Sequence, residues 1–134
     1  MFQNYDLNVA TVHVFVTRFV QVAYHLFDGE DRLPVLANYL AELSLLDHEM
    51  LKYSYSTIAI SCIVLSLHCF KRCHWNTTLE FYSGHKFTGI TDCIKRLHQV
   101  WKCQPHSKLN VIWRKYSRRE YLRVAALHPR LELS

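Results

Sequence analysis

Apolar residues recur at the spacing of α-helices along most of the chain. In the first such series they lie at positions i, i+3, i+4, i+7 and i+8, which predicts an amphipathic helix over about residues 11–24. The series comprises Val12, Phe15, Val16, Phe19, Val20 and Ala23. Residues 28–31 are typical of a loop, and a second helix is predicted with Pro34 in its first turn and its end near Asp47. The apolar side of this second helix comprises Leu33, Leu36, Ala37, Leu40, Leu43, Leu45 and Leu46.

The most apolar segment lies in the middle of the chain. Residues 53–70 contain no Asp, Glu, Lys or Arg, and apolar residues surround the axis of the helix predicted from about Ser56 to Arg72. A helix that is apolar all round is buried in protein or in lipid, and this stretch approaches the length of a membrane span. Six polar residues nevertheless lie inside it: Ser54, Ser56, Thr57, Ser61, Ser66 and His68. We therefore expect a central helix buried by its own domain, and no membrane.

Shorter helices are predicted in the second half of the chain. Residues 77–80 match a capping box, which predicts a short helix to about Ser83 that Gly84 ends in a left-handed conformation. A fifth helix is predicted over about residues 88–102, and further helical turns over 109–120. The apolar residues of the fifth helix are Ile90, Ile94, Leu97 and Trp101.

Composition agrees with a helical domain. The chain has 134 residues, the size of one domain, and half of them are hydrophobic, which excludes a disordered tail. Only three Gly and three Pro are present, whereas a small β-sandwich needs many turn residues. We therefore predict an all-α protein with a single domain over residues 1–134 and a core over about 5–130. About five helices should pack around the buried central helix at about 56–72.

Charge is unevenly divided along the sequence. Residues 1–85 carry five basic and eight acidic residues, whereas residues 86–134 carry eleven basic and three acidic residues, a net charge of +8. A basic segment attracts nucleic acid, an anionic membrane or an acidic protein surface, although a solvated basic face is the commoner case. The run from Ile112 to Tyr121 interleaves basic and aromatic residues, a pattern that also occurs in nucleic-acid binding.

The residue types that carry chemistry do not fall into a catalytic or metal-binding motif. Eight histidines and cysteines form two loose groups, but structural zinc requires close ligand pairs at defined spacing, and no C-x-x-C is present. These eight are His68, Cys69, Cys73, His74, Cys93, His98, Cys103 and His106. We interpret the cysteines as small buried residues, and Asp47 and Glu49 as loop and cap residues. We predict no catalytic, cofactor-binding or metal-binding residue, and therefore no enzyme and no cofactor.

Several short segments resemble, in the same order, the C-terminal cyclin box of A- and B-type (mitotic) cyclins, A-type especially. The longest are residues 39–47, 51–53 and 56–59, which resemble the second and third helices of that box. The resemblance covers about residues 5–130. Supporting segments are Asp6-Leu7, Thr11-Val12 with Phe15, Trp75, Thr78 to Glu80, Tyr82 to Gly84, Leu97 to Gln99, Ile112, Lys115-Tyr116, Tyr121 and Val124-Ala125.

The sequence also departs from the family at two helix starts. Tyr55 stands where the family usually has proline before the third helix, and Ala10 where proline often opens the first. These changes should loosen both starts and suggest a divergent member. The Met-Arg-Ala-Ile-Leu signature of the N-terminal cyclin box, which makes most kinase contacts in the family, does not occur in these residues. No partner-binding residue is therefore assigned.

The resemblance implies a regulatory role. Cyclins are non-catalytic regulatory subunits of cyclin-dependent Ser/Thr protein kinases in cell-cycle control, in the nucleus and cytoplasm. We expect this chain to be a fragment or isoform of a longer cyclin, or to keep only the C-terminal box. Its main role should be to support the kinase-binding N-terminal box in cis. The alternative is a cyclin-fold nucleic-acid-binding module of transcription-factor type that uses the basic residues 86–134, although nucleic acid is the less expected partner.

Overall fold

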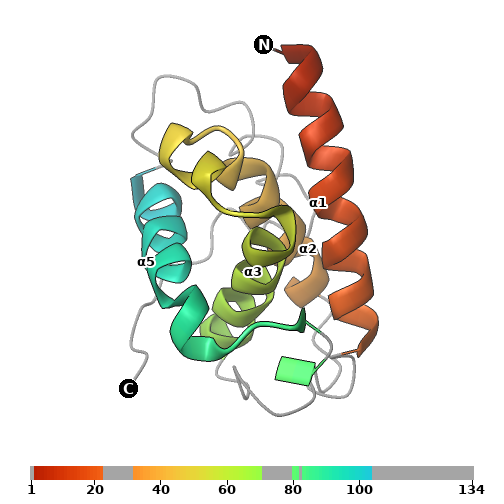
Figure 1. Ribbon diagram of the computed structural model, residues 1–134, viewed down its shortest axis with the longest axis vertical. Coiled ribbons are helices and arrows are strands. Elements are labelled where there is room, and N and C mark those ends of the chain that lie inside the picture. The colour runs from red at the N-terminus through yellow and green to blue at the C-terminus, as the bar shows by residue number, and fades with distance from the viewer. Residues whose placement is uncertain (1, 23–31, 71–79, 82, 104–134) are drawn as a thin grey trace.

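The computed structural model describes residues 2–22, 32–70, 80–81 and 83–103 (Figure 1). The regular elements are α1 (Phe2–Val22), α2 (Arg32–Ser44), the 3-10 helix η2 (His48–Lys52), α3 (Tyr55–Cys69) and α5 (Phe87–Cys103). Glu80, Phe81 and Ser83 add a short helical segment, and no strand occurs within these ranges. The predicted all-α fold class is confirmed. Within the same ranges, no helix combines the length and the apolar character that crossing a membrane requires.

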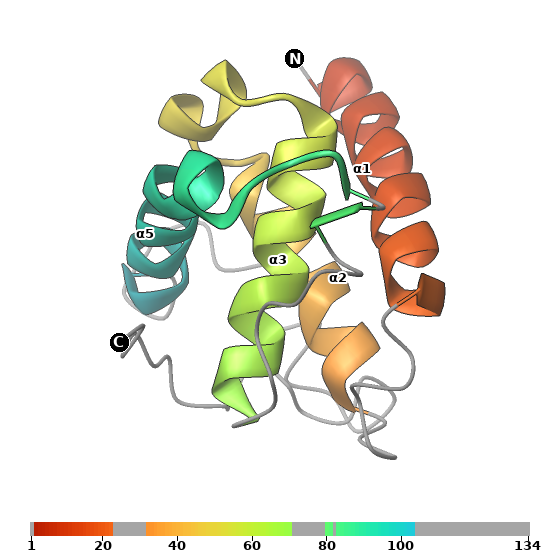
Figure 2. The same ribbon diagram turned by 60° about the horizontal axis from the view of Figure 1, so that its bottom comes forward.

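Helix α3 is the centre of the domain. Figures 1 and 2 show it between α1 and α5, with α2 packed on a third side. Every residue from Thr57 to Leu67 is buried, so all faces of the helix are covered over three turns. Apolar area removed from water on all sides is the main stabilising contribution to the fold. The predicted buried central helix is therefore confirmed.

The serines inside α3 are satisfied by the helix itself. The Ser61 Oγ donates a hydrogen bond of 2.7 Å to the Thr57 carbonyl, and the Ser66 Oγ donates one of 2.7 Å to the Cys62 carbonyl. A buried hydroxyl without a partner costs about 1–3 kcal/mol, and these bonds avoid that loss. This internal bonding explains how a helix with several polar residues lies in an apolar core.

The start of α3 is well defined despite the missing proline. Ser54 is its N-cap, and the Thr57 backbone N–H donates to the Ser54 Oγ over 3.2 Å. An N-cap serine satisfies a backbone donor that the first turn leaves open. The helix ends at Cys69, earlier than the predicted Arg72, which lies outside the described residues.

The first two helices differ from the prediction at their ends. Helix α1 begins at Phe2, nine residues before the predicted start, because Ala10 and its neighbours contain no residue that stops a helix. Helix α2 ends at Ser44, before the predicted Asp47. A turn at residues 45–46 follows, and then the 3-10 helix η2, which the periodicity did not predict. Leu46 lies in this turn and is 45% exposed, so its assignment to the apolar face was wrong.

Three of the predicted features lie outside the described residues. They are the loop at 28–31, the first three residues of the capping box, 77–79, and the helical turns at 109–120. The other predicted helix is confirmed: α5 runs from Phe87 to Cys103 and buries Ile90, Ile94, Leu97 and Trp101. Gly84 has φ +72°, and its N–H donates to the Glu80 carbonyl over 3.0 Å, which confirms the predicted left-handed helix end.

Two glycines with different backbones give a paired test of stability. Gly84→Ala should lower the free energy of unfolding by about 1 kcal/mol, because a side chain is strained at positive φ. Gly89 lies in α5, and a Cβ added there meets no atom within 4 Å. Gly89→Ala should therefore raise the free energy of unfolding by up to about 1 kcal/mol. Urea denaturation of both variants measures the two changes in the free energy of unfolding. A lower free energy of unfolding for Gly89→Ala as well as for Gly84→Ala would contradict the different backbone conformations of the two glycines.

Candidate functional site

The structure does not gather the candidate metal ligands into a site. Within the described part of the chain, no group of three or more His, Cys, Asp or Glu side chains is placed to hold a metal ion. Cys73, His74 and His106 lie outside that part, as does the side chain of Cys103. Partial burial, and after it the neighbouring Lys102 and His68, lower the pKa of His98. The lowered pKa follows from these surroundings and by itself marks no catalytic role.

Two cysteines lie in the core between α3 and α5. Cys62 and Cys93 are both fully buried and carry free thiols. Burial raises the pKa of Cys93 to about 11, although the Ser61 hydroxyl lowers it. Burial, and after it the neighbouring Cys93, raise the pKa of Cys62. The thiolate is the nucleophile, so neither residue is suited to covalent catalysis. The interpretation of these cysteines as small buried residues is confirmed.

Alkylation tests this assignment. At about pH 8, Cys62 and Cys93 should react with iodoacetamide about a hundredfold more slowly in the folded chain than in urea, because both burial and a raised pKa oppose attack. Half-buried Cys69 is the internal control and should react faster in the same sample. Peptide mapping by mass spectrometry separates the sites. Equal rates at Cys93 and Cys69 would contradict the burial.

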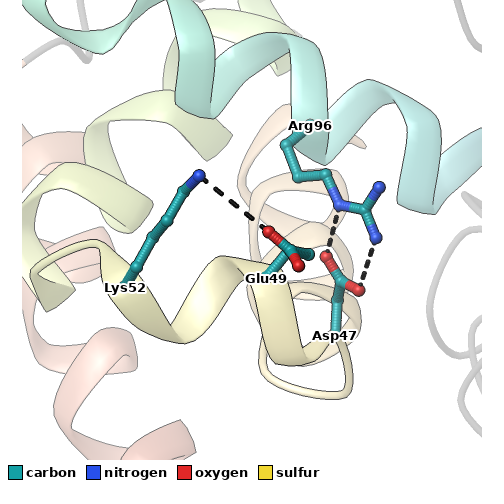
Figure 3. A network of polar contacts seen from close by, with 4 residues as sticks. All are labelled: Asp47, Glu49, Lys52 and Arg96. Carbon is teal, nitrogen blue, oxygen red and sulfur yellow. Dashed lines mark hydrogen bonds and ion pairs between the residues drawn. The ribbon is translucent and has the colours of Figure 1, made fainter.

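The main polar contact joins distant parts of the chain. Arg96 of α5 donates two hydrogen bonds of 2.7 Å, from Nε and Nη2, to the two carboxylate oxygens of Asp47 (Figure 3). Asp47 precedes η2 and is the better covered partner, with 16% of its side chain exposed against 42% for Arg96. Asp47 occupies the N-cap position of η2, as its interpretation as a loop or cap residue predicted, but its side chain makes no cap hydrogen bond and binds Arg96 instead. A bidentate Arg–carboxylate pair fixes the relative orientation of the two side chains in addition to its charge attraction. Here it holds the start of η2 against α5.

A double-mutant cycle measures this contact. Asp47→Ala, Arg96→Ala and the double variant should give a coupling energy of about 1 kcal/mol, reduced by salt because Arg96 is partly exposed. The matched control is Glu49 with Lys52, whose charged atoms are 3.9 Å apart with both side chains at least 60% exposed. That pair should couple by less than about 0.5 kcal/mol. Equal coupling energies would contradict the assigned role of Asp47.

Three other contacts join the helices. The Nδ1 of His13 in α1 and the Oδ1 of Asn38 in α2 form a hydrogen bond of 2.9 Å. The Oγ of Ser56 in α3 and the Nε2 of His85, in the connection before α5, form another of 2.9 Å. The Arg32 guanidinium lies 4.9 Å from the centre of the Phe70 ring, a cation–π distance. Together with the core, these contacts define the class: an all-α domain packed around one buried helix, in which several polar contacts connect separate elements of the fold.

Comparison with known proteins identifies the family. Residues 10–130 match the family described as "Cyclin, C-terminal domain". The chain is 37% identical to Cyclin-A1-1 of Oryza sativa subsp. japonica over 126 residues, 90% of this chain and 24% of the relative. It is 34% identical to Cyclin-A1-1 of Arabidopsis thaliana over 124 residues, 90% of this chain and 27% of the relative. For G2/mitotic-specific cyclin-A of Hydra viridissima the identity is 32% over 126 residues, 93% of this chain and 30% of the relative.

The chain therefore belongs to the cyclin C-terminal domain family, and its similarity to A-type cyclins is confirmed. It spans about a quarter to a third of the length of the Oryza relatives that it matches. The pairing of Asp47 with Arg96 was not predicted from the sequence. The two residues are 49 positions apart, and no local pattern signals a contact at that separation.

Proposed function

We propose that the chain acts as the C-terminal domain of a cyclin, a non-catalytic regulatory subunit of a cyclin-dependent Ser/Thr protein kinase in cell-cycle control. The observation that carries the proposal is the family match over residues 10–130 on an intact core around α3. In such complexes the regulatory subunit positions kinase elements that complete the ion pair and metal site of phosphoryl transfer. The named relatives are cyclins, and nothing in them supports the nucleic-acid alternative.

Within this proposal, the domain mainly supports a kinase-binding N-terminal box in cis. The fully buried α3 and the contact between Asp47 and Arg96, which hold the described helices together, support such a role. We also place its action in the reducing nucleus and cytoplasm. Support comes from Cys62, Cys69 and Cys93, which all carry free thiols. A fluorescent fusion that entered the secretory pathway would contradict this location.

A reconstitution assay tests the regulatory role. The chain is compared alone and fused behind the N-terminal cyclin box of an A-type relative, with a cyclin-dependent kinase and a peptide substrate. Alone it should bind the kinase weakly and leave its activity near the basal level. The fusion should activate the kinase more strongly and melt at a higher temperature than the N-terminal box by itself. Full activation by the chain alone would overturn the supporting role, and no gain in the fusion would overturn the regulatory one.

A further inference from the structure

An open groove of about 430 Å³ lies between η2 and α5. On α5 its lining residues are spaced i, i+3, i+4 and i+7, so they occupy one face of the helix, distinct from the buried face that contains Ile94 and Leu97. Figure 3 shows Lys52 and Arg96 extending into the space between η2 and α5 from opposite sides. The groove is lined by Lys52, Tyr53, Asp92, Lys95, Arg96 and Gln99.

Positive charge dominates this lining. Arg96 is held by Asp47, which neutralises it and fixes the wall of the groove. Lys52 is only weakly paired, since the Glu49 carboxylate is 3.9 Å away and both side chains are well exposed. Exposed Lys95 forms no hydrogen bond or ion pair with any other described residue. Lys52 and Lys95 are therefore the two cations of the lining that no close ion pair with another described residue holds, and Asp92 is the one carboxylate among the lining residues.

The rest of the lining adds selectivity. The half-buried ring of Tyr53 provides an apolar wall, and the Lys52 Nζ lies 5.3 Å from its centre. Asp92 lies one helical turn before Lys95 on α5 and places a negative charge at that end. A ligand that fits carries carboxylates toward the two lysines, an apolar group against Tyr53, and no anion at Asp92.

We propose that this groove binds an acidic peptide segment of a partner protein. An extended segment suits an open groove, whereas small-molecule sites enclose most of their ligand. Nucleic acid is a poorer match, because it presents a continuous row of phosphates, and Asp92 places a negative charge at one end of the groove. The inference goes beyond the kinase-regulatory role and does not depend on it.

Fluorescence anisotropy with the full chain tests the proposal. The probe is a short labelled peptide with several Glu residues around one Tyr, compared with its Gln counterpart. The acidic peptide should bind at low salt, more weakly as salt is added, and the Gln peptide should not bind. Lys52→Glu with Lys95→Glu should weaken binding by about tenfold or more. The matched control is Arg18→Glu with Lys86→Glu, the same charge change at exposed residues that do not line the groove, and it should change affinity by less than about threefold.

Asp92→Asn supplies a test of opposite sign. Removing this carboxylate should strengthen binding of the acidic peptide by about twofold to fivefold. Circular dichroism of each variant checks that the helices are intact. The proposal is overturned if the acidic peptide does not bind at low salt, or if the groove and control double variants weaken it equally. It is also overturned if only a phosphoserine peptide, or single-stranded nucleic acid, binds in a groove-dependent way.

Discussion

Ile60→Ala in the middle of α3 should lower the free energy of unfolding by about 2–5 kcal/mol. The Ile60 side chain is fully buried within a helix that is covered on all sides, so the removed atoms leave a cavity that neighbouring helices cannot close. Domains of this size are stable by only about 5–15 kcal/mol, so one such change removes a large share of the total. Urea denaturation followed by circular dichroism gives the difference directly.

Leu46→Ala is the matched control for Ile60. Leu46 is 45% exposed in the turn after α2, and its truncation should lower the free energy of unfolding by less than about 1 kcal/mol. If Ile60→Ala does not fold, Ile60→Val keeps the comparison quantitative, with an expected loss of about 0.5–1.5 kcal/mol. Equal losses for Leu46→Ala and Ile60→Ala would show that α3 is not the centre of the core.

Hydrophobic patterns that extend over many residues predicted the helical core well. Burial of α3 follows from an apolar stretch without charges, and the buried face of α5 follows from a regular 3.6-residue repeat. Such patterns are repeated along many residues, so a single deviation does not hide them. Helix ends depend on one or two residues. The end at Gly84 was predicted because positive φ selects glycine. The start of α1 at Phe2 was missed, although Phe2, Tyr5 and Val9 continue the apolar spacing of the helix before Val12.

The polar edge of the domain was much less predictable. Asp47 was placed correctly near the end of α2, but its partner Arg96 comes from α5 and is brought close only by the packing of both helices on α3. The groove beside them combines residues of two elements for the same reason. Local sequence rules describe neighbours along a helix, whereas these contacts depend on the tertiary arrangement. A basic segment was recognised, but its charge count could not show which lysines share a surface.

Trp101 gives the second large effect, because it anchors the C-terminal part of α5. It is the largest fully buried side chain in the described residues, with 2% of its surface exposed. Trp101→Ala should lower the free energy of unfolding by about 3–5 kcal/mol, and Trp101→Phe by less, since an aromatic ring still fills part of the site. Gln99→Ala, at an exposed position of the same helix, should change it by less than about 0.5 kcal/mol.

Hydrogen exchange locates the effect of Trp101→Ala within the fold. Helices α1, α2 and α3 contact one another without α5, so their amides should keep more protection than those of α5 when Trp101 is truncated. Protection would then fall first over residues 87–103, and the loss of the groove between η2 and α5 would follow, because four of its lining residues come from that helix. Uniform loss of protection across all helices would contradict this order and would show that α5 unfolds only together with the core.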